Sequence, residues 1–155
     1  QQVFGEGVDT YSRMMSFSGA GAVTGALVVA WLGRFDGMGR VLLVLQAVFS
    51  LLVIAIAWSR SMPLTYLLLF AAGVSTIITT SLVTSLVQLV APDHMRGRVL
   101  SIYMVAFRGG MPLGSLVSGA LVSRVGLPLV LTVNGALLCL AAMYFLTRKE
   151  GVVRV

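Results

Sequence analysis

Charged residues are scarce in this sequence: they make up 10% of its 155 residues, against about 25% in an average soluble domain. Hydrophobic residues make up 58%, and the mean hydropathy is +1.00. A folded surface with this composition cannot be hydrated over most of its area. The composition therefore excludes an ordinary soluble domain.

The sequence contains a single cysteine, Cys139, and a single histidine, His94. One cysteine forms no disulfide framework, and one histidine builds neither a metal cluster nor a histidine-based triad. We interpret Cys139 as a small apolar packing residue and His94 as a solvated loop residue that follows Asp93, a candidate helix cap. No catalytic residue, metal site or cofactor is predicted.

Acidic residues are also few, and we expect all of them outside the long apolar runs: Glu6, Asp9, Asp36, Asp93 and Glu150. The predicted spans then contain no carboxylate pair. The residues that an intramembrane aspartyl protease or a proton-carrying acid would require are therefore absent from them. The net charge of +6 comes from basic residues scattered singly between apolar runs. Without a basic patch, nucleic acid is not an expected partner.

Long apolar runs dominate what remains. A helix rises about 1.5 Å per residue and the hydrocarbon core is about 30 Å thick, so a membrane span needs about 20 such residues. Five stretches qualify, at roughly 11–32, 41–58, 64–90, 99–125 and 127–146. They lack the alternation of β-barrel strands. The sequence predicts an all-α polytopic membrane protein in which residues 1–155 form one bundle of five transmembrane helices.

The segments between these spans are short, which makes successive helices antiparallel neighbours, with a tight turn expected around Gly126. Alternate connections differ in basic residues. One side carries Arg34, Arg40, Arg96, Arg98, Arg148, Lys149 and Arg154. The other side carries Arg13, Arg60 and Arg124. The positive-inside rule then predicts a cytoplasmic C-terminus.

The chain begins at Gln1 without a basic segment or a cleavage site of the kind that marks a signal peptide. With a cytoplasmic C-terminus, an odd number of spans places the N-terminus outside. We therefore expect this chain to be a piece of a longer protein, with further helices before it.

Arg108 is the one charged residue well inside a predicted span. An arginine near mid-bilayer costs about 2.5 kcal/mol or more, and such residues usually face a bundle interior or a watery cavity. One interpretation is therefore a functional residue that faces the interior. The other is an arginine that extends toward the cytoplasm or braces the packing through backbone carbonyls.

A polar stripe runs along the third predicted span. Thr76, Thr80, Thr84 and Gln88 recur every four residues, which places them on one helix face. Two interpretations remain open at this point. The stripe could line an aqueous substrate path, or its hydroxyls could bond across a helix interface or back to their own helix.

Glycine and proline indicate where helices approach one another. Gly21 and Gly25 lie four residues apart in the first span, and Gly110 and Gly114 do so in the fourth. Small residues at this spacing permit close packing of helices. Pro112 lies between the second pair and predicts a kink, because proline removes a backbone donor.

Segments 92–101 (PDHMRGRVLS) and 108–114 (RGGMPLG) together resemble the major facilitator superfamily. The closest resemblance is to the bacterial branch of the enterobactin exporter and the macrolide-efflux-like permeases, in which a Pro-Asp-x-x-Arg-Gly-Arg-Val segment links helices ten and eleven. Segment 33–40 (GRFDGMGR) is similar to the basic loop between helices eight and nine. Val29 stands where that loop pattern has an acid, which puts a salt-bridge role there in doubt.

The resemblance covers essentially the whole chain, as helices eight to twelve. It implies the C-terminal part of a secondary active transporter in a bacterial inner membrane, an exporter of small molecules that works by alternating access. Its implied partners are the lipid bilayer, the preceding helices, a small-molecule substrate and a coupling ion. Cytoplasmic gating candidates are Arg34, Arg40, Asp93, Arg96 and Arg98. The alternatives are a membrane-embedded enzyme and a non-transporting scaffold or channel subunit.

Overall fold

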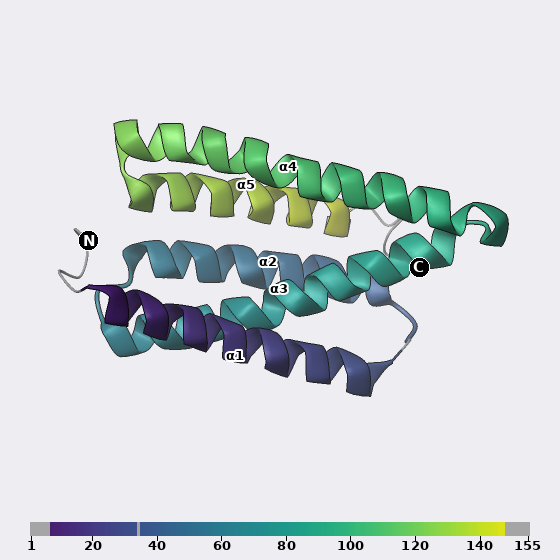
Figure 1. Cartoon of the computed structure of the whole chain (residues 1–155), viewed down its shortest axis with the longest axis horizontal. Coiled ribbons are helices and arrows are strands. Elements are labelled where there is room, and N and C mark those ends of the chain that lie inside the picture. The colour runs from purple at the N-terminus through teal and green to yellow at the C-terminus, as the bar shows by residue number, and fades with distance from the viewer. Residues whose placement is uncertain (1–6, 34, 148–155) are drawn as a thin grey trace.

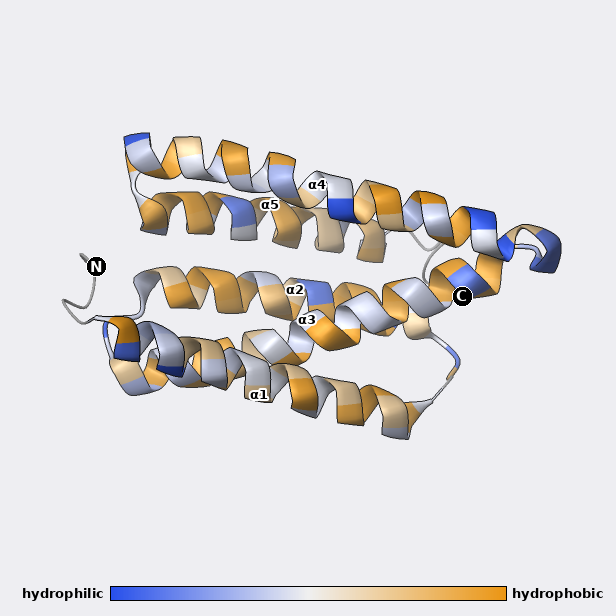
Figure 2. Cartoon of the chain, in the orientation of Figure 1, coloured by the Kyte–Doolittle hydropathy of each residue, from blue (hydrophilic) through white to orange (hydrophobic). Residues whose placement is uncertain are grey.

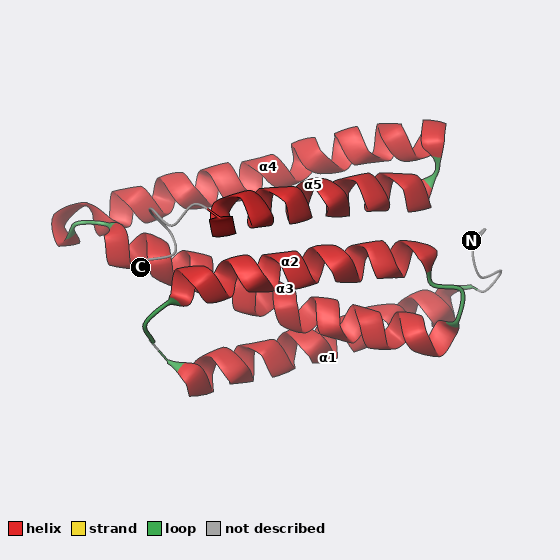
Figure 3. Cartoon of the chain, turned by 180° about the vertical axis from the view of Figure 1, so that it is seen from behind, coloured by secondary structure: helices red, strands yellow, loops and turns green. Residues whose placement is uncertain are grey.

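The computed structural model describes residues 7–33 and 35–147, which form five long α-helices and one short 3-10 turn (Figure 1). The helices are α1 (Val8–Leu32), α2 (Met38–Trp58), α3 (Met62–Val90), α4 (Arg96–Val125) and α5 (Leu127–Thr147), with the 3-10 turn η1 (Asp93–Met95) before α4. The described part of the chain contains no strand (Figure 3). The predicted all-α fold is confirmed.

All five helices are long and apolar enough to cross a membrane. A chain in lipid must satisfy its backbone donors and acceptors internally, and a continuous helix does this within one segment. Four helices begin slightly before the predicted spans. As a result Asp9, expected outside the first span, lies exposed in the first turn of α1. A negative charge at this end is favourable, because it meets the positive end of the helix dipole.

Glycine and proline residues lie at several of the helix boundaries. Gly126 alone separates α4 from α5, with a φ angle of 86°, in the left-handed region that suits glycine. Its N–H donates to the carbonyl oxygen of Val122 at 3.0 Å. Pro63 lies in the first turn of α3, where a missing N–H removes no helical hydrogen bond.

The bundle is held together mainly by α1, α2, α3 and α5. Helix α1 crosses α3, while α2 lies between α3 and α5 (Figure 1). Buried positions are few among the described residues: Ser50 of α2 is 0% exposed, and Met38 of α2 and Ala142 of α5 are each 2% exposed. Helix α4 contacts α5 and α3 only lightly and has no buried residue.

Hydrophobic residues run along all five helices, while many of the most hydrophilic residues lie toward the helix ends and one lies near the middle of α4 (Figure 2). Leu67 of α3 and Leu137 of α5, for example, are 63% and 61% exposed. An apolar surface of this extent marks a membrane or protein contact. The protein is therefore a multi-pass membrane protein whose outer surface contacts lipid.

Candidate functional site

The connections between helices gather at two opposite ends of the bundle. The α1–α2 and α3–α4 connections lie at one end, and the α2–α3 and α4–α5 connections lie at the other (Figure 1). The first end, which we call the basic end, carries Arg40, Arg96 and Arg98, all exposed. Predicted residues Arg34, Arg148, Lys149 and Arg154 lie outside the described residues.

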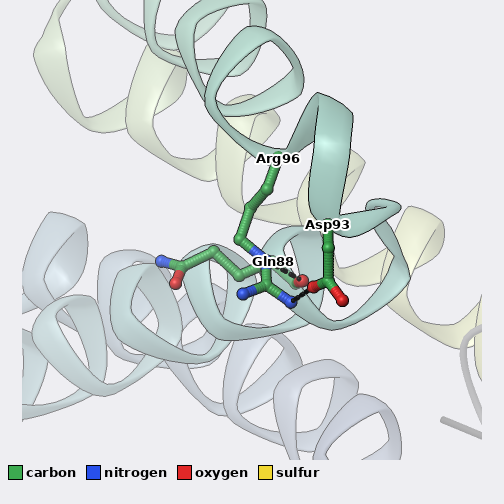
Figure 4. Close-up of polar contacts among 3 residues, drawn as sticks. All are labelled: Gln88, Asp93 and Arg96. Carbon is green, nitrogen blue, oxygen red and sulfur yellow. Dashed lines mark hydrogen bonds and ion pairs between the residues drawn. The ribbon is translucent and has the colours of Figure 1, made fainter.

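Arg96 and Asp93 form an ion pair at the basic end (Figure 4). One Nη of Arg96 donates to Oδ1 of Asp93 at 2.7 Å, and Nε donates to the backbone carbonyl of Gln88 at 3.2 Å. The side chain of Arg96 thus reaches from the start of α4 back over the last turns of α3. Two fixed bonds hold the guanidinium in one orientation.

Asp93 does not cap a helix, contrary to the interpretation from sequence. The residue before α4 is Met95, and no side-chain hydrogen bond caps η1 or α4. The competing partner is Arg96, whose guanidinium offers charge-assisted bonds to a carboxylate. His94 lies exposed next to Asp93.

The hydroxyls of the polar stripe bond back to their own helix. Thr76, Thr80 and Thr84 donate to the carbonyls of residues 72, 76 and 80, each four positions earlier. Thr76 is exposed, while Thr80, Thr84 and Gln88 are partly exposed. Each hydroxyl oxygen still has lone pairs that can accept a bond from water or a substrate.

Arg108 lies exposed near the middle of α4. It is 12 residues from the start of that helix, or about 18 Å along the axis. Within the part of the chain that the structure describes, the only ion pair is Arg96–Asp93. No described carboxylate therefore neutralises Arg108.

The two glycine pairs have different surroundings. A Cβ at Gly21 would collide with the carbonyl oxygen of Phe70, and one at Gly25 would lie 2.7 Å from that of Val74. In contrast, no atom lies within 4 Å of a Cβ built at Gly110 or Gly114. Contact of this second pair with another helix remains a prediction, since the described residues provide none. Helix α4 continues without interruption through Pro112.

Sequence reasoning missed Gly73, the partner of the first glycine pair. A Cβ there would collide with the carbonyl oxygen of Ser18 on α1, so both helices lack side chains at their crossing. Gly73 has no glycine four residues away, and the spacing rule could not find it. Sequence reasoning also missed the bond from the indole N–H of Trp58 on α2 to Oγ1 of Thr132 on α5, at 3.0 Å.

The described residues include no group of three or more histidine, cysteine or acidic side chains that could hold a metal ion. What the structure brings together is a long apolar bundle, an exposed arginine in the middle of α4 and an ordered ion pair at the basic end. These features define a polytopic membrane protein with an arginine near the middle of one candidate membrane span.

A family model described as "transmembrane secretion effector" matches residues 1–151. The chain belongs to this family, which is of the major facilitator type and comprises membrane transporters. The comparison with curated proteins found no match, and the comparison with solved structures found none either.

Proposed function

We propose that this chain forms the C-terminal part of a secondary active exporter that moves small anionic molecules by alternating access. The observation that carries the anionic preference is Arg108, exposed near the middle of α4 with no described carboxylate paired to it. A cation at that depth is costly unless it meets an anion or water. Membership of the secretion-effector family supports transport in the outward direction.

The polar stripe on α3 is the second element of the proposed path. The hydroxyls of Thr76, Thr80 and Thr84, with the Gln88 amide, would offer acceptors and donors to water or a substrate. Their bonds to the helix backbone hold each hydroxyl in one rotamer. Acceptor lone pairs would then face a hydrated cavity between this chain and the preceding helices.

The basic end supplies the proposed cytoplasmic gate. The Arg96–Asp93 pair ties the α3–α4 connection to the end of α3, so the two helices would move together. Arg40 and Arg98 are further gating candidates at the same end, and Arg34, outside the described residues, is a candidate from its sequence alone. In this proposal the C-terminus is cytoplasmic, the membrane is a bacterial inner membrane, and an ion gradient drives the cycle. The branch of the enterobactin exporter and macrolide-efflux-like permeases is the proposed placement within the superfamily.

The decisive experiment measures efflux from cells that express the full-length protein. Cells are loaded with carboxyfluorescein as the anionic probe or with ethidium as the cationic probe, with and without an uncoupler that collapses the proton gradient. We expect saturable carboxyfluorescein efflux that stops in the uncoupler. Efflux linear in concentration would favour a channel, and no efflux of either probe from correctly folded protein would favour a scaffold or a membrane-embedded enzyme.

A further inference from the structure

An apolar crevice of about 490 Å³ opens at the basic end, beside the last turns of α3. Its walls include Leu42 of α2, Leu86, Val87 and Val90 of α3, and Val99 of α4. The volume lies in the range of about 300–1,000 Å³ that is typical of small-molecule sites. All of its lining residues are apolar, so the crevice suits a hydrocarbon chain and has no polar group to orient a sugar or peptide.

Three arginines lie next to these walls in the sequence and at the same end of the bundle. In the sequence, Arg98 precedes the lining residue Val99, and Arg40 is two residues before Leu42. Arg96 donates to the backbone carbonyl of Gln88, the residue that follows Val87 (Figure 4). The two described bonds of Arg96 use two of its five N–H donors. Three donors therefore remain for an anionic ligand.

Charge at this end is unbalanced. The described acids here are Asp93 and Asp36, against the three arginines, and Asp93 is already paired with Arg96. Neither Arg40 nor Arg98 forms an ion pair within the described residues. The basic end therefore carries arginines without a described ion-pair partner at the same end of the bundle as the apolar crevice.

We propose that the crevice and Arg96 and Arg98 at its rim form a binding site for an anionic phospholipid. In a phospholipid, the acyl chains meet the charged headgroup at the depth where a transmembrane helix ends. Val90 is the last residue of α3 and Arg96 is the first residue of α4, so both lie at a helix end. A second transmembrane helix would fill the crevice, but its apolar surface would leave the rim charges without partners. Clusters of basic residues next to membrane helices attract anionic lipid at about 1 kcal/mol per arginine.

The test counts lipids bound to the full-length protein by native mass spectrometry. The protein, purified in detergent, is titrated with dioleoyl-phosphatidylglycerol or with dioleoyl-phosphatidylcholine. If Arg96 and Arg98 each contribute about 1 kcal/mol, the anionic lipid should bind about 30-fold more tightly than the zwitterionic one. Equal binding of the two lipids would overturn the proposal.

Matched variants locate the site. Arg98→Gln should lower the phosphatidylglycerol preference about fivefold, because it removes one rim charge. Arg124→Gln, an exposed arginine at the far end of the same helix, should leave that preference unchanged. Val90→Trp should reduce binding of both lipids, because Val90 lines the crevice and is 70% exposed, so a larger side chain fills the mouth without disturbing a core.

Equal effects of Arg98→Gln and Arg124→Gln would show general charge attraction and overturn a defined site. Unchanged binding in Val90→Trp would show that no acyl chain enters the crevice. Because the side chains of Arg98, Arg124 and Val90 make no described hydrogen bond, all three variants should elute like the parent protein in size-exclusion chromatography. Lipid counting does not depend on transport, so the result stands whether or not the protein exports carboxyfluorescein.

Discussion

A Cβ atom at Gly25 would lie 2.7 Å from the carbonyl oxygen of Val74, which means that α1 and α3 touch backbone to backbone. Membrane helices associate through packing and hydrogen bonds, since lipid removes most of the hydrophobic driving force between them. The small residues Gly21, Gly25 and Gly73 therefore determine how closely these two helices approach.

Replacement of Gly25 by alanine should separate α1 from α3. We expect a loss of about 1–3 kcal/mol, as for overpacking of a well-packed core, measured as a lower melting temperature of the purified protein. Gly19→Ala is the matched control on the same helix, because nothing lies within 4 Å of a Cβ at Gly19. It should be neutral or slightly stabilising, since alanine is the better helix former. Equal melting temperatures for the two variants would contradict the close contact.

If the chain is the C-terminal part of a transporter, as proposed, Gly114 should contact one of the preceding helices. Gly114→Leu should then reduce the folded yield or the efflux of the full-length protein, because a leucine prevents close approach. Within the described chain the position is open, so packing of α4 on α5 should not change. Yield is measured by fluorescence-detected chromatography, and efflux with carboxyfluorescein. A fully active Gly114→Leu protein would rule out this helix contact.

The stripe on α3 should be accessible to water in at least one transport state. We expect cysteines at Thr80 and Thr84 to react with a small hydrophilic thiol reagent, after Cys139, the single native thiol, is replaced by alanine. Leu82→Cys on the same helix is the control, since Leu82 is 4% exposed and should stay protected. If positions 80 and 84 are as unreactive as position 82 in every state, the hydroxyls serve packing alone.

Arg108 should be required for transport and dispensable for membrane insertion. Arg108→Ala should abolish efflux, while insertion improves because a cost of about 2.5 kcal/mol for a charge within the bilayer is removed. Arg108→Lys should retain part of the activity, since it keeps the charge and loses the planar, multi-donor geometry. Efflux and folded yield are measured together for both variants. Normal transport by the alanine variant would show that the Arg108 side chain extends toward the cytoplasm or supports packing and is not part of the substrate path. Failure of that variant to fold would show that the role of Arg108 is structural.

The basic end should face the cytoplasm. Intact cells that express single-cysteine variants are treated with a membrane-impermeant maleimide. A cysteine in place of Arg96 should be protected, and a cysteine in place of Arg60 should be labelled. The reason is the excess of arginine and lysine that the sequence places on the side of Arg96 when alternate connections are compared. Labelling at position 96 together with protection at position 60 would reverse the proposed topology.

Packing partners were the part of the fold that the sequence did not reveal. The spacing of Gly21 and Gly25 indicated close approach without naming α3, and the same spacing at Gly110 and Gly114 has no contact in the described chain. Spacing reports which residues share a helix face. Which helix lies opposite that face depends on residues far away in the chain, such as Gly73.

In the candidate site too, the sequence indicated which residues share a helix face, and only the structure showed their bonding partners. Four-residue spacing placed Thr76, Thr80 and Thr84 on one face, and only the structure showed that their hydroxyls bond to backbone carbonyls of α3. Likewise, Asp93 and Arg96 were both candidates, but the bond from Arg96 to the Gln88 carbonyl depends on how the chain reverses through residues 91–95.

The sequence by itself determined that the described residues form five helices long and apolar enough to span a membrane, with basic residues divided unequally between alternate connections. These properties are local, because a continuous apolar run in lipid must satisfy its backbone bonds within its own helix. Tertiary structure alone decided that α1 meets α3 through glycines and that an apolar crevice opens beside the arginines of the basic end. Both depend on backbones separated by tens of residues coming within van der Waals reach, which no local pattern specifies.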